Sequence, residues 1–182
     1  MAVAEDVARI AGAAAAFAEA GEALAGVVVA ETLGRRVYLC AYESSEAHAW
    51  LAFDQDARPL RERRLVREAA SLAALCEVAE EVAGGGDLDR LRASLAELRE
   101  REGPPGIEAA EAAAAELAET LQPPPRVASG PYLDALGSAS RRLEQALGDY
   151  GPSPFSAALH AALGSVEELA ADVERRYKLP LT

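Results

Sequence analysis

The sequence predicts an α+β protein that is predominantly helical. Two patterns support this fold class: apolar residues recur every three or four positions over most of the chain, whereas residues 27–53 are rich in β-branched and aromatic side chains. Clusters of glycine and proline separate the periodic segments. We therefore expect a three-stranded antiparallel β-meander flanked by two helices and followed by a four-helix, bundle-like C-terminal half.

The first helix is expected over residues 3–25. Its apolar stripe consists of Val3, Val7, Ile10, Ala14, Phe17, Gly21 and Leu24. Glu5 and Asp6 stand before the most apolar part of this helix, which argues against a secretory signal peptide because the start of such a signal is basic. Gly26 is expected to end the helix.

Three strands are expected over residues 27–32, 37–43 and 48–53. Gly34 suits the first central position of a type II′ turn between the first two strands. With even-length loops, one face carries Val27, Val29, Tyr38, Cys40, Tyr42, Leu51 and Phe53, and the other carries Val28, Val37, Leu39, Ala41, His48 and Trp50. Because both faces are largely apolar, we expect helices or another subunit to cover them.

Five further helices are expected after Pro59. The first of these, which is the second helix of the chain, ends at Gly84–Gly86, and the others cover residues 88–98, 107–121, 133–150 and 155–177. Asp87 is the expected N-cap of the helix over 88–98, and Ser153–Pro154 are expected to begin the helix over 155–177. The prolines at 123–125 predict a stiff spacer, and the short link Gly151–Pro152 predicts an antiparallel helix pair. Two domains, 1–86 and 87–182, are expected, unless one continuous core joins them.

The formal net charge of −12 disfavours nucleic acid and anionic membranes as partners. No stretch is apolar enough for a membrane span. Cys40 and Cys76 lack CxxC spacing and fall on predicted buried positions, which is typical of reduced thiols. We therefore expect a cytoplasmic protein.

Motifs for cofactors, metals and catalysis are missing from the sequence. The two histidines and two cysteines are not spaced as metal ligands, and neither a phosphate-binding glycine loop nor a Gly-x-Ser-x-Gly motif occurs. Cys40 and His48 could meet through the meander, but a buried inert thiol is the favoured interpretation. The carboxylates of the fourth helix are interpreted as a solvated face: Glu108, Glu111, Glu116 and Glu119. No cofactor and no metal are expected.

Five arginines stand within ten residues of this acidic chain: Arg58, Arg61, Arg63, Arg64 and Arg67. One interpretation is a site for a small anion or an acidic partner near the start of the second helix, where backbone amides would add donors. The other is a solvated helix face, with Arg64 paired to Glu68.

Aromatic residues gather on the predicted sheet, where Tyr38, Tyr42 and Trp50 accompany His48. Such side chains can anchor a protein partner or a flat ligand. Ordinary core packing under the helices is the competing interpretation, and it is favoured because both faces of the sheet need cover.

The abundance of amphipathic helices and the lack of catalytic motifs favour a non-catalytic protein-protein interaction or assembly module. Self-association as a two-fold homodimer is the expected form. The alternative is a sensor domain that binds a small anionic or aromatic ligand between the sheet and the second helix. An enzyme whose catalytic residues converge from distant segments is the third hypothesis.

Overall fold

The computed structural model describes residues 2–46, 48–84, 86–122, 126–150, 156–165 and 168. The fold is α+β and mainly helical, as the sequence predicts. It divides into two compact units. The described residues up to Ala74, with 126–130 and 168, form the sheet unit, and those from Leu75 to Gln122, with 131–150 and 156–165, form the helical unit. Whether segments 1–86 and 87–182 fold independently stays a prediction.

Helix α1 spans Ala2–Ala14 and continues as one 3₁₀ turn, η1, at Ala15–Phe17. The expected helix over residues 3–25 is therefore wrong in its second half. Gly21, with φ of +88°, lies between η1 and strand β1, which begins at Ala23 and pairs there with Glu43. Alanine favours a helix by propensity, but the hydrogen bonds of the sheet outweigh that preference here.

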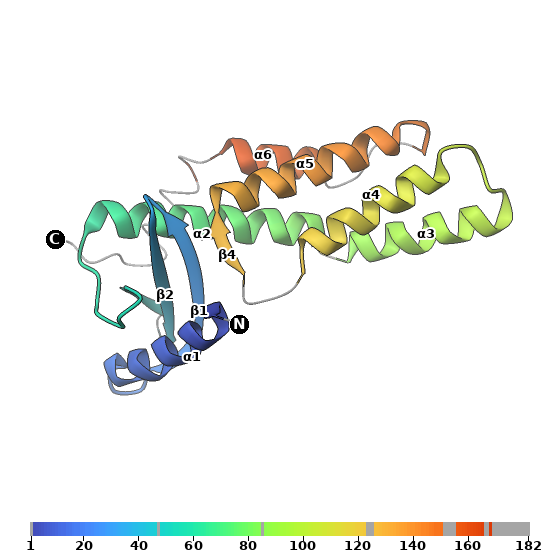
Figure 1. Ribbon diagram of the computed structural model, residues 1–182. Coiled ribbons are helices and arrows are strands. Elements are labelled where there is room, and N and C mark those ends of the chain that lie inside the picture. The colour runs from blue at the N-terminus through green and yellow to red at the C-terminus, as the bar shows by residue number, and fades with distance from the viewer. Residues whose placement is uncertain are drawn as a thin grey trace. The chain divides into compact units, whose positions relative to one another are not determined.

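Strands β1 (Ala23–Thr32), β2 (Arg35–Glu43) and β3 (His48–Phe53) form the expected antiparallel meander (Figure 1). The sheet is nevertheless four-stranded and mixed, because β4 (Val127–Ser129) pairs in parallel with β1 and gives the order β3-β2-β1-β4. A strand of three residues is too short to show an alternating pattern, which explains why the sequence did not predict it.

The turn between β1 and β2 differs from the expected type. Thr32 pairs with Arg35, so the two central residues are Leu33 and Gly34, with φ of +50° and +69°. Positive φ at both central positions defines a type I′ turn, whereas type II′ has it only at the first. Gly34 therefore occupies the second central position, and a leucine takes the first.

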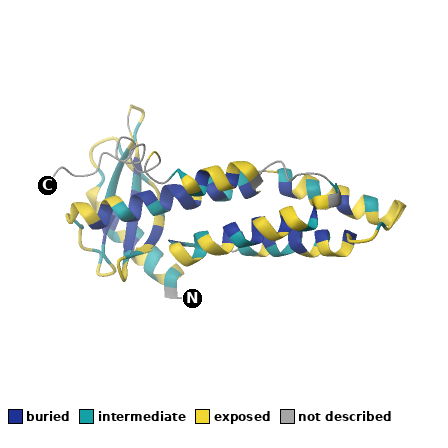
Figure 2. Ribbon diagram, turned by 90° about the horizontal axis from the view of Figure 1, so that it is seen from above, coloured by how far each residue is buried: buried dark blue, intermediate teal, exposed yellow. Residues whose placement is uncertain are grey.

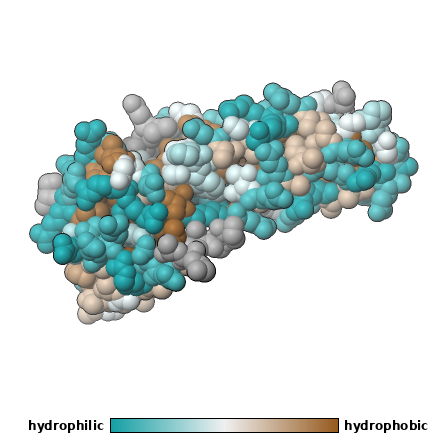
Figure 3. Space-filling view, viewed as in Figure 1, coloured by the Kyte–Doolittle hydropathy of each residue, from teal (hydrophilic) through white to brown (hydrophobic). Residues whose placement is uncertain are grey.

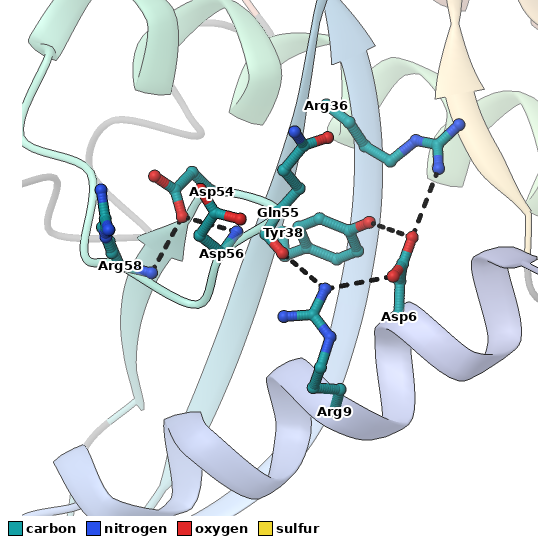
Figure 4. A network of polar contacts seen from close by, with 8 residues as sticks. All are labelled: Asp6, Arg9, Arg36, Tyr38, Asp54, Gln55, Asp56 and Arg58. Atoms are coloured by element: carbon teal, nitrogen blue, oxygen red, sulfur yellow. Dashed lines mark hydrogen bonds and ion pairs between the residues drawn. The ribbon is translucent and has the colours of Figure 1, made fainter.

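The predicted grouping of the strand residues into two faces is confirmed, although the turn at Leu33 and Gly34 shifts the pairing of β1 with β2 by two residues from the expected one. Val29, Tyr38 and Phe53 lie side by side on one face, which packs against α1. On the other face Ala30, Val37, Leu39 and Ala52 are buried. Figures 1 and 4 show α1 on one side of the sheet and the first part of α2 on the other. Both faces are thus covered within the sheet unit, so an uncovered face supplies no reason for dimerisation.

The helical unit contains the second half of α2 (Arg63–Gly84) and the helices α3 (Asp87–Arg101), α4 (Ile107–Thr120), α5 (Gly130–Ala146) and α6 (Ser156–Gly164), with a 3₁₀ turn, η2, at Gly148–Tyr150. Figure 2 shows the buried stripes of these helices. Their shared core includes Ala83, Leu95, Leu117, Leu143 and Leu159. Because α2 contributes Ala79 and Ala83, this core has five helical segments rather than the expected four.

Some details of the expected helices change and others fall outside the described residues. Gly86, in a left-handed conformation with φ of +71°, takes the N-cap position of α3, so the predicted cap Asp87 is the first helical residue. Ser153–Pro154, Gly151–Pro152, the spacer at 123–125 and nearly all of the expected sixth helix beyond residue 165 lie outside the described part of the chain.

Candidate interaction surface

The basic segment comprises Arg58, Arg61, Arg63, Arg64 and Arg67. All five residues are exposed. Arg58 closes the turn that follows β3, Arg61 stands just before α2, and the other three lie in the first turns of α2. The structure therefore places the whole predicted segment on the surface of the sheet unit.

The turn before the basic segment is fixed by Asp54 (Figure 4). Its Oδ1 accepts hydrogen bonds from the backbone N–H groups of Asp56 and Arg58, both at 2.9 Å. The backbone N–H of Asp54 also donates to the carbonyl of Arg58 at 3.0 Å, and that of Leu60 donates to the carbonyl of Ala52 at 2.7 Å. The chain that leads into α2 is thereby held along the outer edge of β3.

Two glutamates partly neutralise this segment. Arg64 Nε lies 3.1 Å from Glu68 Oε1, which confirms the expected pair. Glu62 Oε2 lies 2.6 Å from Nη1 of Arg35, a residue of β2. Arg63 makes no ion pair within the described residues. With five arginines and two glutamates between positions 58 and 68, the segment keeps an excess of positive charge.

The start of α2 carries the wrong sign of charge for helix stability. Its first turn contains Arg63 and Arg64 and no acidic residue. The N-terminal N–H groups of a helix are a region of partial positive charge, where a cation is unfavourable by about 0.3–1 kcal/mol. The helix dipole therefore does not favour Arg63 and Arg64 at this position, although Arg64 pairs with Glu68 one turn later.

Leu33, at the turn between β1 and β2, is the most exposed large apolar side chain in the described residues, at 54%. The others are Phe17 and Val28, and all three belong to the sheet unit. Figure 3 shows strongly hydrophobic side chains at the surface over the sheet, among hydrophilic ones. Sequence reasoning missed Leu33, although Leu-Gly at a two-residue turn, where Asn-Gly is preferred, was a usable signal.

The structure does not bring the four predicted aromatic-anchor residues together. Tyr38 and Tyr42 are buried under α1, where the Tyr42 hydroxyl donates to the carbonyl of Ala14 at 2.7 Å. His48 and Trp50 belong to the other face; His48 is exposed and Trp50 is half-buried. The two tyrosines are therefore core residues, and an anchor role for Trp50 and His48 stays a prediction.

A polar network joins α1 to the sheet beside Tyr38 (Figure 4). The Tyr38 hydroxyl donates to Asp6 Oδ2 at 3.2 Å, Arg9 donates to Asp6 Oδ1 at 3.1 Å, and Arg36 Nη1 lies 3.7 Å from Asp6. The hydrogen bond from Arg9 is the main cause that lowers the pKa of Asp6, while burial raises the pKa of Tyr38. These contacts satisfy the hydroxyl of buried Tyr38 and connect α1 to the sheet, so we interpret the network as structural.

Cys40 is buried in the sheet, and burial raises the pKa of its thiol to about 12. A thiol with such a pKa carries almost no thiolate near neutral pH, so it is a poor nucleophile. Cys40 pairs with Leu51, whereas His48 stands three residues away on β3 and so points to the opposite face. The structure therefore does not assemble a Cys-His pair from these residues.

Several polar groups of the helical unit form ion pairs between neighbouring helices. Of the α4 carboxylates, Glu111 lies 2.9 Å from Arg99 and Glu116 pairs with Arg142. His160 Nε2 lies 3.6 Å from Glu144. In the described part of the chain, no three His, Cys, Asp or Glu side chains gather as a metal site would require.

Comparison with known proteins identifies no family for this chain: no family model matches it, and no curated protein or solved structure matches it significantly. Within the described residues, none of the helices combines the length and apolar character that a membrane-spanning helix requires.

Proposed function

We propose that this protein is a non-catalytic assembly module that self-associates through the outer edge of β1. The supporting observation is the mismatch between β1 and its neighbour β4. Strand β1 is ten residues long, but β4 pairs only with Val29–Glu31. Among the described residues, the backbone of Ala23–Val28 therefore has no strand on that side. An unpaired edge offers N–H and C=O groups to another strand.

The side chains along this edge favour a second copy as the occupant. Residues 23–28 are Ala, Leu, Ala, Gly, Val and Val, with neither a charge nor a proline to block pairing. Two such edges related by a two-fold axis place only uncharged residues opposite each other. Val28, 37% exposed, would then gain apolar cover from the partner.

The β-bulge at Ala25 limits the strength expected of this contact. The pairing of β1 with β2 shifts register between Leu24 and Gly26, and a bulge increases the local twist of a strand. A twisted edge pairs over few residues, so we expect a dimer that forms at tens of micromolar and dissociates on dilution.

Light scattering after size exclusion tests the proposal. The native chain should show a dimeric mass at high concentration, whereas a Gly26→Glu, Val28→Glu variant should be monomeric because like charges would face each other. A Cβ added at Gly26 meets no atom within 4 Å, and Val28 is 37% exposed, so this variant should still fold. Leu33→Asn, in the same unit but off the edge, is the matched control and should stay dimeric. A native monomer at high concentration, or a dimer that the glutamates leave intact, would contradict the proposal.

A further inference from the structure

The face of the sheet that lies towards α2 is not buried along its whole length. On this face Leu39 and Ala52 pair with each other and are buried, at 1% and 3% exposed. Two positions further along the same face, Ala41 pairs with Trp50, and both are only partly buried. Gly26, which pairs with Ala41 from β1, is exposed. We call the row of Gly26, Ala41 and Trp50 the open end of the α2 face.

The composition of the open end suits an apolar cover. None of its three residues is charged, and Trp50 is the only tryptophan of the chain. The indole is one of the largest apolar groups that a protein can bury. Because the adjacent row of Leu39 and Ala52 is already buried, one further element over the open end would extend the core on this face.

The chain returns to the sheet unit after α6. Residues 156–165 belong to the helical unit, whereas Glu168 belongs to the sheet unit. Residues 169–182 follow Glu168 and lie outside the described part of the chain. As a helix, a segment of this length would span about 20 Å, which is about the length of a six-residue strand such as β3. The segment is therefore long enough to cover the open end.

We propose that residues 169–177 dock on the open end as an amphipathic helix, with their apolar face against Trp50 and Ala41. Leu169, Val173 and Tyr177 recur every four positions, so in a helix they share one face. This face carries no charge, as the open end does not. Pairing two uncharged surfaces removes apolar area from water and leaves no charge buried without a partner.

Tethering favours this segment over a separate molecule as the occupant. A segment attached through Glu168 to the sheet unit has an effective concentration of about millimolar near its site. A second copy of the chain at micromolar concentration would have to bind far more tightly to displace it. The inference does not rest on the proposed self-association, because it uses the face of the sheet rather than the edge of β1.

The fluorescence of Trp50 tests the inference on the full chain, because no other tryptophan contributes to the signal. Leu169→Asp with Val173→Asp should shift the emission to longer wavelengths and increase its quenching by acrylamide, since the indole becomes exposed. Ala171→Asp adds a charge on the opposite side of the same helix, so this matched control should change neither. Dilution of the native chain should leave the emission unchanged, because docking within one chain does not depend on concentration.

A nitroxide spin label provides a second test that leaves the apolar face intact. The label is attached at Glu174→Cys, while the buried thiols of Cys40 and Cys76 stay protected. It should broaden the indole N–H signal of Trp50 in the NMR spectrum. The broadening should disappear when Leu169→Asp and Val173→Asp are added to the labelled chain.

Three outcomes would overturn the inference. They are native emission in the double aspartate variant, an equal shift in Ala171→Asp, and a red shift of the native chain on dilution, which would assign the open end to a second copy. If circular dichroism shows that the double variant unfolds, the spin label decides, and an unbroadened Trp50 signal would overturn the inference. Light scattering separates this result from the proposed self-association, because the folded variants should keep the native mass.

Discussion

Arg35 Nη1 and Glu62 Oε2 lie 2.6 Å apart and connect the start of β2 to the residue just before α2. Both side chains are about half exposed, at 46% and 58%. An exposed ion pair contributes only about 0–1 kcal/mol to stability. Its larger consequence is positional, because it keeps the turn at Leu33 beside the basic segment and occupies one of the two glutamates there.

Replacing Glu62 with glutamine should change stability little. The free energy of unfolding in urea should change by less than about 1 kcal/mol, because the pair with Arg35 is exposed. Glu97→Gln, which removes the exposed partner of Arg101 on α3, is the matched control and should change it as little. A loss of several kcal/mol in the Glu62 variant would show that the ion pair is needed to hold the turn at Leu33 in place.

Leu33→Asn should stabilise the protein. Asparagine tolerates the left-handed conformation, so the variant should gain about 1 kcal/mol in free energy of unfolding, measured by calorimetry. Ala57→Gly relieves another positive φ, of +61°, and should gain less because glycine also increases the entropy of the unfolded chain. A clear loss of stability in Leu33→Asn would mean that packing of the leucine outweighs the strain of its backbone.

The sequence predicted those parts of the fold in which local pattern and tertiary structure agree. Helical spacing located the helices after Pro59, and loop length predicted the register that sets Tyr38 beside Phe53. The prediction failed where a partner strand decides the structure. Ala23 and Leu24 continue an alanine-rich, helix-favouring stretch, yet they pair with β2, and β4 is defined only by its contact with β1.

The same distinction applies to the candidate surface. The basic segment is contiguous, so composition alone locates it. The contact of Arg35 with Glu62 spans 27 positions and that of Tyr38 with Asp6 spans 32, and neither has a local signature. Leu33 could have been recognised from its turn once its strands were aligned, but the type II′ assignment placed the glycine one position too early.

Cys40 and Cys76 should be protected from thiol reagents in the folded protein. Both thiols are buried, so a reagent cannot reach them in the folded protein. The pKa of Cys40 is also raised to about 12, so almost no reactive thiolate forms there near neutral pH. Mass spectrometry of the native chain should show slow labelling at a rate set by unfolding, and rapid double labelling in urea. Fast labelling of native Cys40 would contradict this prediction and would support a nucleophilic role for its thiol.

Tyr42→Phe should lower the free energy of unfolding at neutral pH and should make it fall less steeply at alkaline pH. Burial raises the pKa of Tyr42 from 10.0 to about 12 in the folded protein, so the folded state holds its proton where the unfolded state loses it. The stability that protonated Tyr42 contributes to the folded protein is therefore fully present below pH 10 and is lost as the pH rises towards 12. In that window the native free energy of unfolding should fall by up to about 1.4 kcal/mol per pH unit for this group.

Urea unfolding of both proteins at a series of pH values measures this difference. At neutral pH the phenylalanine variant should be less stable by about 1 kcal/mol, because it lacks the hydrogen bond of the hydroxyl to the Ala14 carbonyl. Above pH 10 its curve should decline less steeply, since a phenylalanine side chain has no proton to lose. The two curves should therefore converge towards high pH. Parallel curves would show that Tyr42 ionises alike in the folded and unfolded states, contrary to its burial under α1.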